Sequence, residues 1–287
     1  MKLGVTFPQL DFGADAEGIR AYTQAAQDLG FEYLLAYDHV LGADVTNRPG
    51  WSGYTKADSF HEPFVLFAFM SAVAPKLEYV TGVIILPQRQ TVLVAKQAAE
   101  VDILTGGKFR LGIGVGWNHV EFEGLNEEFS NRGKRVEEQV ELMRKLWTEP
   151  VVTFEGSYHR VTEAGLNPLP IQRPIPIWIG GTADVVLERT ARIADGWFPL
   201  GRCSPENLER INRLRDLTEA AGRDRHAVGI DARIDMRGVP EAEWGEEIKR
   251  WREAGATHLS LNTMYQGYST QEHIAAIERF MRVASNA

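Results

Sequence analysis

Short β-rich runs alternate with helix-like stretches along the whole of this 287-residue chain. Runs that are apolar throughout, such as residues 83–86, are typical of parallel strands buried on both faces. Between the runs, apolar residues recur at the spacing of one helix face. Eight strand–helix units predict an α/β fold, a (β/α)8 TIM barrel, rather than an open doubly wound sheet. The expected strands are Leu3–Pro8, Tyr33–His39, Tyr79–Leu86, Phe109–Val115, Ile175–Ile179, Gly196–Leu200, Val228–Ile234 and Thr257–Thr263.

Two connections are unusually long. Leu41–His61 follows the second strand, and Trp117–Arg173 follows the fourth. The second connection contains an expected helix near Asn131–Trp147 and an expected hairpin at Val151–Val161. Because both leave the carboxyl ends of strands, we expect them to cover the mouth of the barrel as lids. No linker is evident, so residues 1–287 are expected to form a single domain that includes the 117–173 insertion.

Charge and composition exclude several classes of protein. Lys and Arg total 31 against 39 Asp and Glu, which gives a net charge of −8 and no basic footprint for nucleic acid. A single cysteine, Cys203, rules out a disulfide framework and a cysteine-rich zinc site. No apolar run reaches the length of a membrane span, and a strand begins at Leu3 without a preceding signal peptide. A cytoplasmic protein that acts on a small molecule is the expectation.

The segment after the fifth expected strand predicts an anion site. The buried run Ile175–Ile179 stops at Gly180, Gly181 and Thr182, and a helix is expected to begin near Asp184. Glycines ahead of a helix leave backbone N–H groups free at its positive end, an arrangement that commonly binds phosphate. We therefore expect a phosphorylated ligand to be held by main-chain groups.

Asp38 and His39 close the second expected strand and are the leading catalytic candidates. No other histidine falls at the carboxyl end of a strand, and an imidazole there can exchange a proton near neutral pH. The chain has no lysine at a strand end, no His-x-His pair and no Gly-x-Ser-x-Gly elbow. These absences argue against Schiff-base, metal-dependent and serine-hydrolase chemistry. An organic cofactor is the simplest remaining source of reactivity.

Glycines also mark the third and fourth expected strands. The spacing of Gly112, Gly114 and Gly116 does not fit a dinucleotide-binding fingerprint. Two explanations stay open for them: tight packing of strands, or close approach of the backbone to a flat ring. Trp117 is then either an apolar wall of the pocket or a buried loop anchor. Gly82 interrupts the third strand ahead of Val83, which predicts a bulge or a close approach.

These residues together resemble the bacterial-luciferase-like family, whose members use FMN or the deazaflavin F420. The resemblance runs nearly from end to end and is most like the F420-dependent branch. Its motifs are Tyr37-Asp38-His39, Thr81-Gly82-Val83, Phe109 to Trp117, Leu146-Trp147, Trp178-Ile179-Gly180-Gly181 and Asp195-Gly196-Trp197.

The resemblance implies roles for individual positions. Asp38 and His39 would lie beside the cofactor ring, with His39 as proton donor or acceptor. Gly82–Val83 would form a non-prolyl cis peptide that backs the ring. Gly180, Gly181 and Thr182 would hold the phosphate. Gly114, Gly116, Trp117 and Asn118 complete the expected cofactor-binding set.

Three functions follow as expectations. The first is an F420-dependent oxidoreductase that transfers a hydride between the deazaflavin and a small organic substrate. The alternative is an FMN-dependent monooxygenase that uses O2 and receives reduced flavin from a partner reductase. A third possibility is a binding or storage protein without turnover. The resemblance also implies a homodimer.

Overall fold

The computed structural model describes residues 1–287, and its central feature is a closed parallel sheet. Strands pair in the order β3-β2-β1-β11-β10-β9-β8-β5, and β3 also pairs with β5, which closes the barrel. The predicted (β/α)8 TIM barrel is therefore confirmed. The barrel strands are β1 (Lys2–Thr6), β2 (Tyr33–Ala36), β3 (Glu78–Thr81) with its continuation β4 (Ile84–Ile85), β5 (Phe109–Gly114), β8 (Ile177–Gly180), β9 (Gly196–Phe198), β10 (Gly229–Asp235) and β11 (His258–Asn262).

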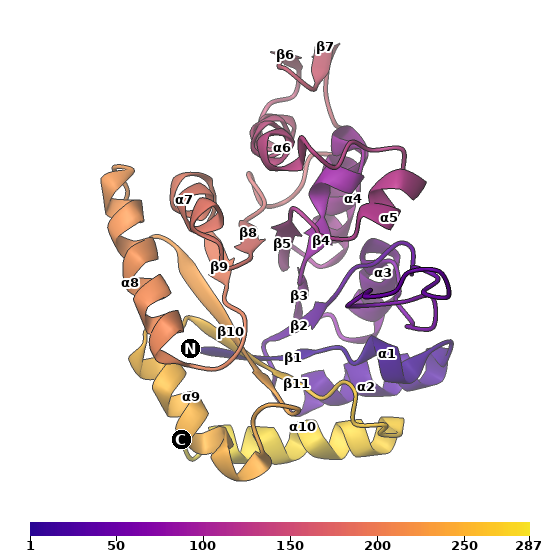
Figure 1. Ribbon diagram of the computed structural model, residues 1–287, viewed down its shortest axis with the longest axis vertical. Coiled ribbons are helices and arrows are strands. Elements are labelled where there is room, and N and C mark those ends of the chain that lie inside the picture. The colour runs from indigo at the N-terminus through magenta and orange to yellow at the C-terminus, as the bar shows by residue number, and fades with distance from the viewer.

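Helices surround this sheet (Figure 1). Asp15 and Ser204 cap α2 and α8 through their side chains, and Ser269 with Glu272 forms a capping box at the start of α10. None of the helices combines the length and apolar character that a bilayer span requires. The helices are α1 (Gln9–Phe12), α2 (Ala16–Asp28), α3 (Pro63–Val73), α4 (Thr91–Leu104), α5 (His119–Gly124), α6 (Arg132–Thr148), α7 (Asp184–Ile193), α8 (Pro205–Ala220), α9 (Trp244–Glu253) and α10 (Thr270–Ala284), with 3-10 turns at Leu86–Gln88 and Glu241–Glu243.

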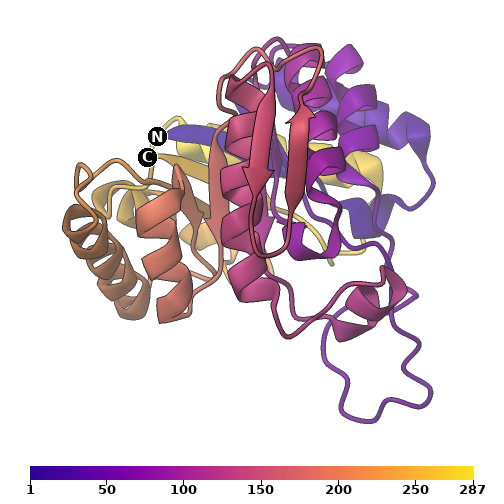
Figure 2. The ribbon, with the colours of Figure 1, turned by 90° about the horizontal axis from the view of Figure 1, so that it is seen from above.

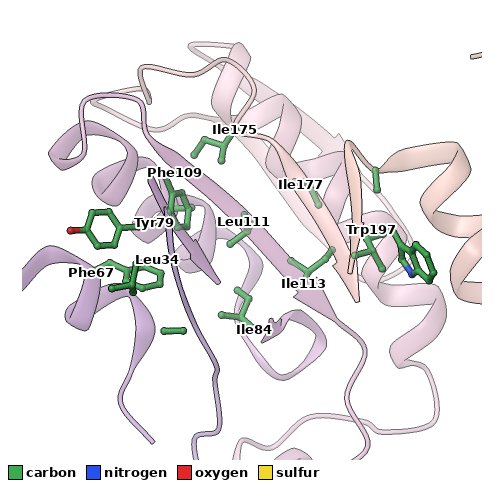
Figure 3. Packing of buried hydrophobic residues seen from close by; sticks show 14 of the residues in the cluster. Leu34, Phe67, Tyr79, Ile84, Phe109, Leu111, Ile113, Ile175, Ile177 and Trp197 are labelled. Atoms are coloured by element: carbon green, nitrogen blue, oxygen red, sulfur yellow. The ribbon is translucent and has the colours of Figure 1, made fainter. Parts of the chain in front are cut away.

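Two separate cores hold the barrel together. A cluster of 58 buried residues lies between the strands and the helices, and Figure 3 shows part of it around β5 and β8. A cluster of five fills the barrel itself: Tyr33, Leu35, Val80, Trp178 and Phe198. Below the mouth, the guanidinium of Arg110 lies between the rings of Tyr33 and Trp178 and pairs with Asp231 at 3.1 Å. The barrel is therefore closed below, and only its carboxyl end is open to a ligand.

The hairpin in the 117–173 insertion forms as β6 (Val152–Glu155) and β7 (Arg160–Ala164), but it is not a lid. In Figure 2 it lies alongside α6, whereas the 41–61 loop and α5 project together on another side. Glu138 of α6 accepts backbone hydrogen bonds from residues 157–159, and His159 bonds Thr91 at the start of α4. These contacts attach the hairpin to the helical layer. The expectation that the whole insertion covers the mouth was therefore wrong for this part.

Candidate active site

A cavity of about 520 Å³ opens at the carboxyl ends of the barrel strands. This is the end at which TIM barrels carry their active sites. The cavity brings together residues that the sequence analysis selected from four different segments. Those that line it are Asp38, His39, Gly82, Val83, Gly114, Gly116, Trp117, Gly180, Gly181 and Thr182.

Asn118 is the one selected residue outside the lining of this cavity. Its side chain accepts a hydrogen bond from the N–H of Val120 at 3.1 Å and so caps α5. Its amide also reaches the carbonyl of Leu41 at 3.5 Å, and the residue is only 2% exposed. Asn118 therefore joins the two long connections behind the cavity wall.

His39 is held by a carboxylate from the second long connection. Its Nδ1 lies 3.1 Å from Oε1 of Glu121, which is fully buried in α5. The rings of Tyr54 and Phe60 pack against the imidazole, each with a centroid separation of 4.7 Å. Nδ1 donates to Glu121, so the tautomer is fixed, and Nε2 has no hydrogen-bond partner in the protein. Nε2 is thus the nitrogen that can exchange a proton with a ligand in the cavity.

Glu121 is tied down by several donors. Its carboxylate accepts the N–H groups of Val40 and Leu41 at 2.8 and 3.2 Å and the side-chain amide of Gln88 at 3.2 Å. Burial alone would raise the pKa of Glu121, but the hydrogen bonds from His39, Gln88 and Leu41 outweigh it and lower the pKa below 4.5. The group is therefore ionised at neutral pH and faces His39 as a fixed negative charge.

Asp38 is paired as well, but with a cation that comes from beyond β4. Arg89 Nη2 donates to Asp38 Oδ1 at 2.9 Å, while Arg89 Nη1 reaches Glu62 at 3.2 Å. Burial raises the pKa of Asp38, and the charge of Arg89 opposes part of that rise. The 2% exposure of the Asp38 side chain makes this pair a buried one. The contact between Asp38 and Arg89 therefore holds the end of β2 in place, next to His39.

The peptide bond between Gly82 and Val83 is cis, as the resemblance implied. It divides the third barrel strand into β3 and β4, and Val83 lies between Gly114 and Gly180 on neighbouring strands. A Cβ at Gly114 would come within 2.7 Å of Val83 Cγ2, and one at Gly180 within 3.1 Å of Val83 Cγ1. The glycines therefore leave room for Val83 to form an apolar wall of the cavity.

The turn from β8 into α7 has the features of an anion site. Gly181 adopts a φ of +130°, a conformation that side chains rarely allow, and its carbonyl accepts the indole N–H of Trp197 at 2.7 Å. No side chain caps α7, and the backbone N–H groups of residues 182–185 donate to no protein acceptor. These free donors lie at the positive end of the helix, beside the cavity.

Trp117 forms part of the mouth and is 45% exposed. Its ring lies 6.0 Å from that of His39 and 5.7 Å from that of Trp51 in the 41–61 loop. Gly53 of the same loop has no room for a side chain because the Trp117 ring occupies it. Trp117 is thus a wall of the cavity, and it also contacts the 41–61 loop, although it is exposed and not the buried anchor of the second explanation.

Sequence reasoning missed Glu121, Arg89 and Arg233. Glu121 lies in a short helix of an insertion and resembles any of the other acidic residues there. Arg89 follows β4 closely, so its position after the end of a strand could have marked it as a candidate site residue. Arg233 was also visible, because it alternates with apolar residues near the end of the expected strand Val228–Ile234.

Comparison with known proteins places this site in a family. Residues 3–236 match the family model described as luciferase-like monooxygenase. Rv0940c of Mycobacterium tuberculosis is 37% identical over 201 residues, which cover 66% of this chain and 69% of that protein. The FMNH2-dependent dimethylsulfone monooxygenase of Pseudomonas putida is 29% identical over 233 residues, covering 79% of this chain and 60% of the enzyme.

Solved structures share the fold at low sequence identity. The monooxygenase RslO1 from Streptomyces bottropensis superposes with a TM-score of 0.82 at 19% identity, covering 100% of this chain and 99% of that one. An F420-dependent secondary alcohol dehydrogenase in complex with an F420–acetone adduct gives 0.79 at 16%, covering 99% and 98%. With the family match over most of its length, the chain belongs to the luciferase-like monooxygenase family of oxidoreductases.

Proposed function

We propose that this protein is an F420-dependent oxidoreductase that transfers a hydride between the deazaflavin and a small organic substrate. The observation that carries the proposal is the His39–Glu121 pair. It presents one unpartnered imidazole nitrogen at the cavity while a buried carboxylate fixes the other. Transfer of a hydride to or from an oxygen-bearing carbon also requires a proton to move, and His39 is placed to accept or donate it.

The residues of the cavity fit the cofactor. Val83 and the glycines at 114 and 180 offer an apolar surface without side chains in the way of a planar ring. The free N–H groups of residues 182–185 suit the phosphate that F420 and FMN both carry. Gly116, Trp117 and Asp38 complete the surroundings of the ring in this proposal. The cofactor, when bound, supplies the carbon that gives or takes the hydride.

The protein would contribute position, exclusion of water and a proton. Trp117, Tyr54 and the 41–61 loop border the mouth and would shield the reacting atoms. Glu121 would hold the proton on Nδ1 of His39 and keep the ring oriented. Two solved F420-dependent enzymes share the fold over 99% of this chain: the secondary alcohol dehydrogenase and the tetrahydromethanopterin reductase of Methanopyrus kandleri, whose TM-score is 0.76.

The FMN alternative is favoured by one relative. The Pseudomonas putida enzyme, an FMNH2-dependent monooxygenase, is 29% identical over 79% of this chain. In that case the same cavity would hold reduced flavin delivered by a partner reductase, and O2 would be consumed. A homodimer stays a prediction of the resemblance, and a cytoplasmic location stays a prediction of the sequence.

The test is oxidation of reduced F420 by a panel of carbonyl compounds, followed without oxygen through the visible absorbance of the oxidised cofactor. We expect turnover with at least one acceptor in the wild type and a loss of about 100-fold or more in His39→Ala. His226→Ala, an exposed histidine, is the matched control. Oxygen uptake with reduced FMN but no reaction of reduced F420 would establish the alternative. Binding of F420 that stays unchanged with every acceptor would indicate a storage protein.

A further inference from the structure

The charged side chains that line the cavity are paired, with one exception. Asp38 pairs with Arg89, His39 with Glu121, Asp231 with Arg110, and Asp235 with Arg237. Arg233, by contrast, has no ion pair and no hydrogen bond within the protein, although it lines the same cavity. The cavity therefore carries one positive charge that no group of the protein pairs with.

The alternation of β10 directs Arg233 into the cavity. Asp231, Arg233 and Asp235 line it, whereas Ala232 and Ile234 are fully buried in the core that faces the helices. The guanidinium lies over the ring of Tyr37, 5.2 Å from its centroid. Tyr37 stands two residues before His39 in the chain. Arg233 therefore reaches toward the same part of the cavity as the proposed proton carrier.

Neither neighbour of Arg233 accepts a hydrogen bond from it, and the charge of Asp235 is shared with Arg237. Burial raises the pKa of Tyr37 to about 12, so the ring under the guanidinium stays a neutral phenol. Both oxygens of Asp235 are occupied: Oδ1 accepts the backbone N–H and Nε of Arg237, and Oδ2 accepts Arg237 Nη2 and the amide of Asn262. Ser260, the register partner of Arg233 on β11, adds only a neutral hydroxyl.

We infer that Arg233 binds an anionic group of the substrate, with a carboxylate as the best match. A guanidinium offers parallel N–H donors that suit a planar carboxylate, and no acceptor in the protein competes with a ligand for those of Arg233. Assigning the anion to the substrate deepens the proposed function and rests on it. The cofactor phosphate is placed elsewhere: β9 separates β10 from β8, so the two sites are on the order of 10 Å apart.

The test compares probes that differ only in charge. Benzoate and benzamide, with acetate and acetamide as a smaller pair, are titrated into the wild type, Arg233→Met and Arg20→Met by calorimetry. Arg20 also lies over an aromatic ring, that of Phe69, but outside the cavity, so it is the matched control. We expect the wild type and Arg20→Met to prefer the carboxylate about tenfold or more, and Arg233→Met to lose that preference.

Two further measurements test whether a lost carboxylate preference in Arg233→Met comes instead from a change in phosphate binding or in stability. FMN and riboflavin differ by the phosphate, and we expect Arg233→Met to retain the preference of the wild type for FMN. Thermal unfolding should show that Arg233→Met melts close to the wild type, because the substitution breaks no ion pair or hydrogen bond and keeps an apolar side chain over Tyr37.

Several results would overturn the inference. These are no carboxylate preference in the wild type, failure of both probe pairs to bind, equal losses in the two variants, a clear fall in the melting temperature of Arg233→Met, or loss of its FMN preference. Probe binding needs neither F420 nor turnover. Failure of the proposed F420 function would therefore leave the anion site standing, and loss of the anion site would leave F420 binding intact.

Discussion

His39 Nδ1 lies 3.1 Å from Oε1 of Glu121, although 82 positions separate the two residues in the chain. One comes from the end of β2 and the other from α5 in the insertion after β5. The contact therefore couples the proposed proton carrier to the folding of the insertion. Removing the carboxylate should affect chemistry more than cofactor binding.

Glu121→Gln tests this coupling. Without the carboxylate, the tautomer and the orientation of the His39 ring are no longer imposed, so we expect the rate of hydride transfer to fall about 100-fold. The pH dependence of the rate should also change, whereas the affinity for F420 should change little. Glu123→Gln, an exposed position on the same helix, should behave as the wild type. Equal rates in both variants would show that Glu121 has only a structural role.

Arg89→Gln tests the buried pair at the end of β2. The change leaves Asp38 without its cation in a site where its side chain is only 2% exposed. Breaking such a pair typically costs about 3–5 kcal/mol of stability. Urea unfolding should show a loss of that size. Lys56→Gln breaks the exposed pair with Asp44 and should change the stability far less, because solvent screens that pair. Similar small losses in the two variants would mean that the Asp38–Arg89 pair is not structurally important.

Gly181→Ala tests the anion site at α7. Its φ of +130° disfavours any side chain, so the substitution should shift the N–H groups of residues 182–185. We expect the preference for FMN over riboflavin to fall about tenfold or more. Gly222→Ala is the control. It also replaces a glycine with positive φ, but that glycine has open space around it and does not line the cavity. An unchanged phosphate preference in Gly181→Ala would place the anion elsewhere.

The buried His273 should make stability depend on pH. Burial lowers the pKa of His273 to about 4 from an ordinary value of 6.5. The folded state thus keeps the ring neutral, while the unfolded chain takes up a proton below about pH 6.5. Stability is complete above that pH and falls as the pH drops toward 4. We expect the melting temperature to fall less in His273→Gln than in the wild type between about pH 7.5 and about pH 5. The exposed variant His226→Gln should follow the wild type; parallel curves for all three would contradict the assignment.

The parts of the site that could be predicted are those whose geometry is local. Gly180 and Gly181 follow a strand and precede a helix, so their role at the end of a barrel strand can be read from neighbouring residues. His39 was identifiable for the same reason, since the carboxyl ends of all barrel strands meet at one mouth. The fold itself followed from the alternation of buried runs and amphipathic helices.

The parts that could not be predicted depend on contacts across the barrel. Glu121 is one acidic residue among many in its insertion, and only the folded chain shows that it faces His39. The hairpin at Val152–Ala164 was predictable as a hairpin, but Glu138 decides that it lies on α6 and not over the mouth. Arg233 became informative only once Arg237 was seen to occupy Asp235.

The most direct measurement is a titration of the purified protein with F420 and with FMN, following the tryptophan fluorescence. Trp117 borders the cavity, so a bound ring should quench its emission, and Trp117→Phe should lose most of that signal. We expect saturable quenching by F420 at an affinity clearly above that for FMN. Tight binding of FMN with no response to F420 would contradict the proposed F420-dependent function.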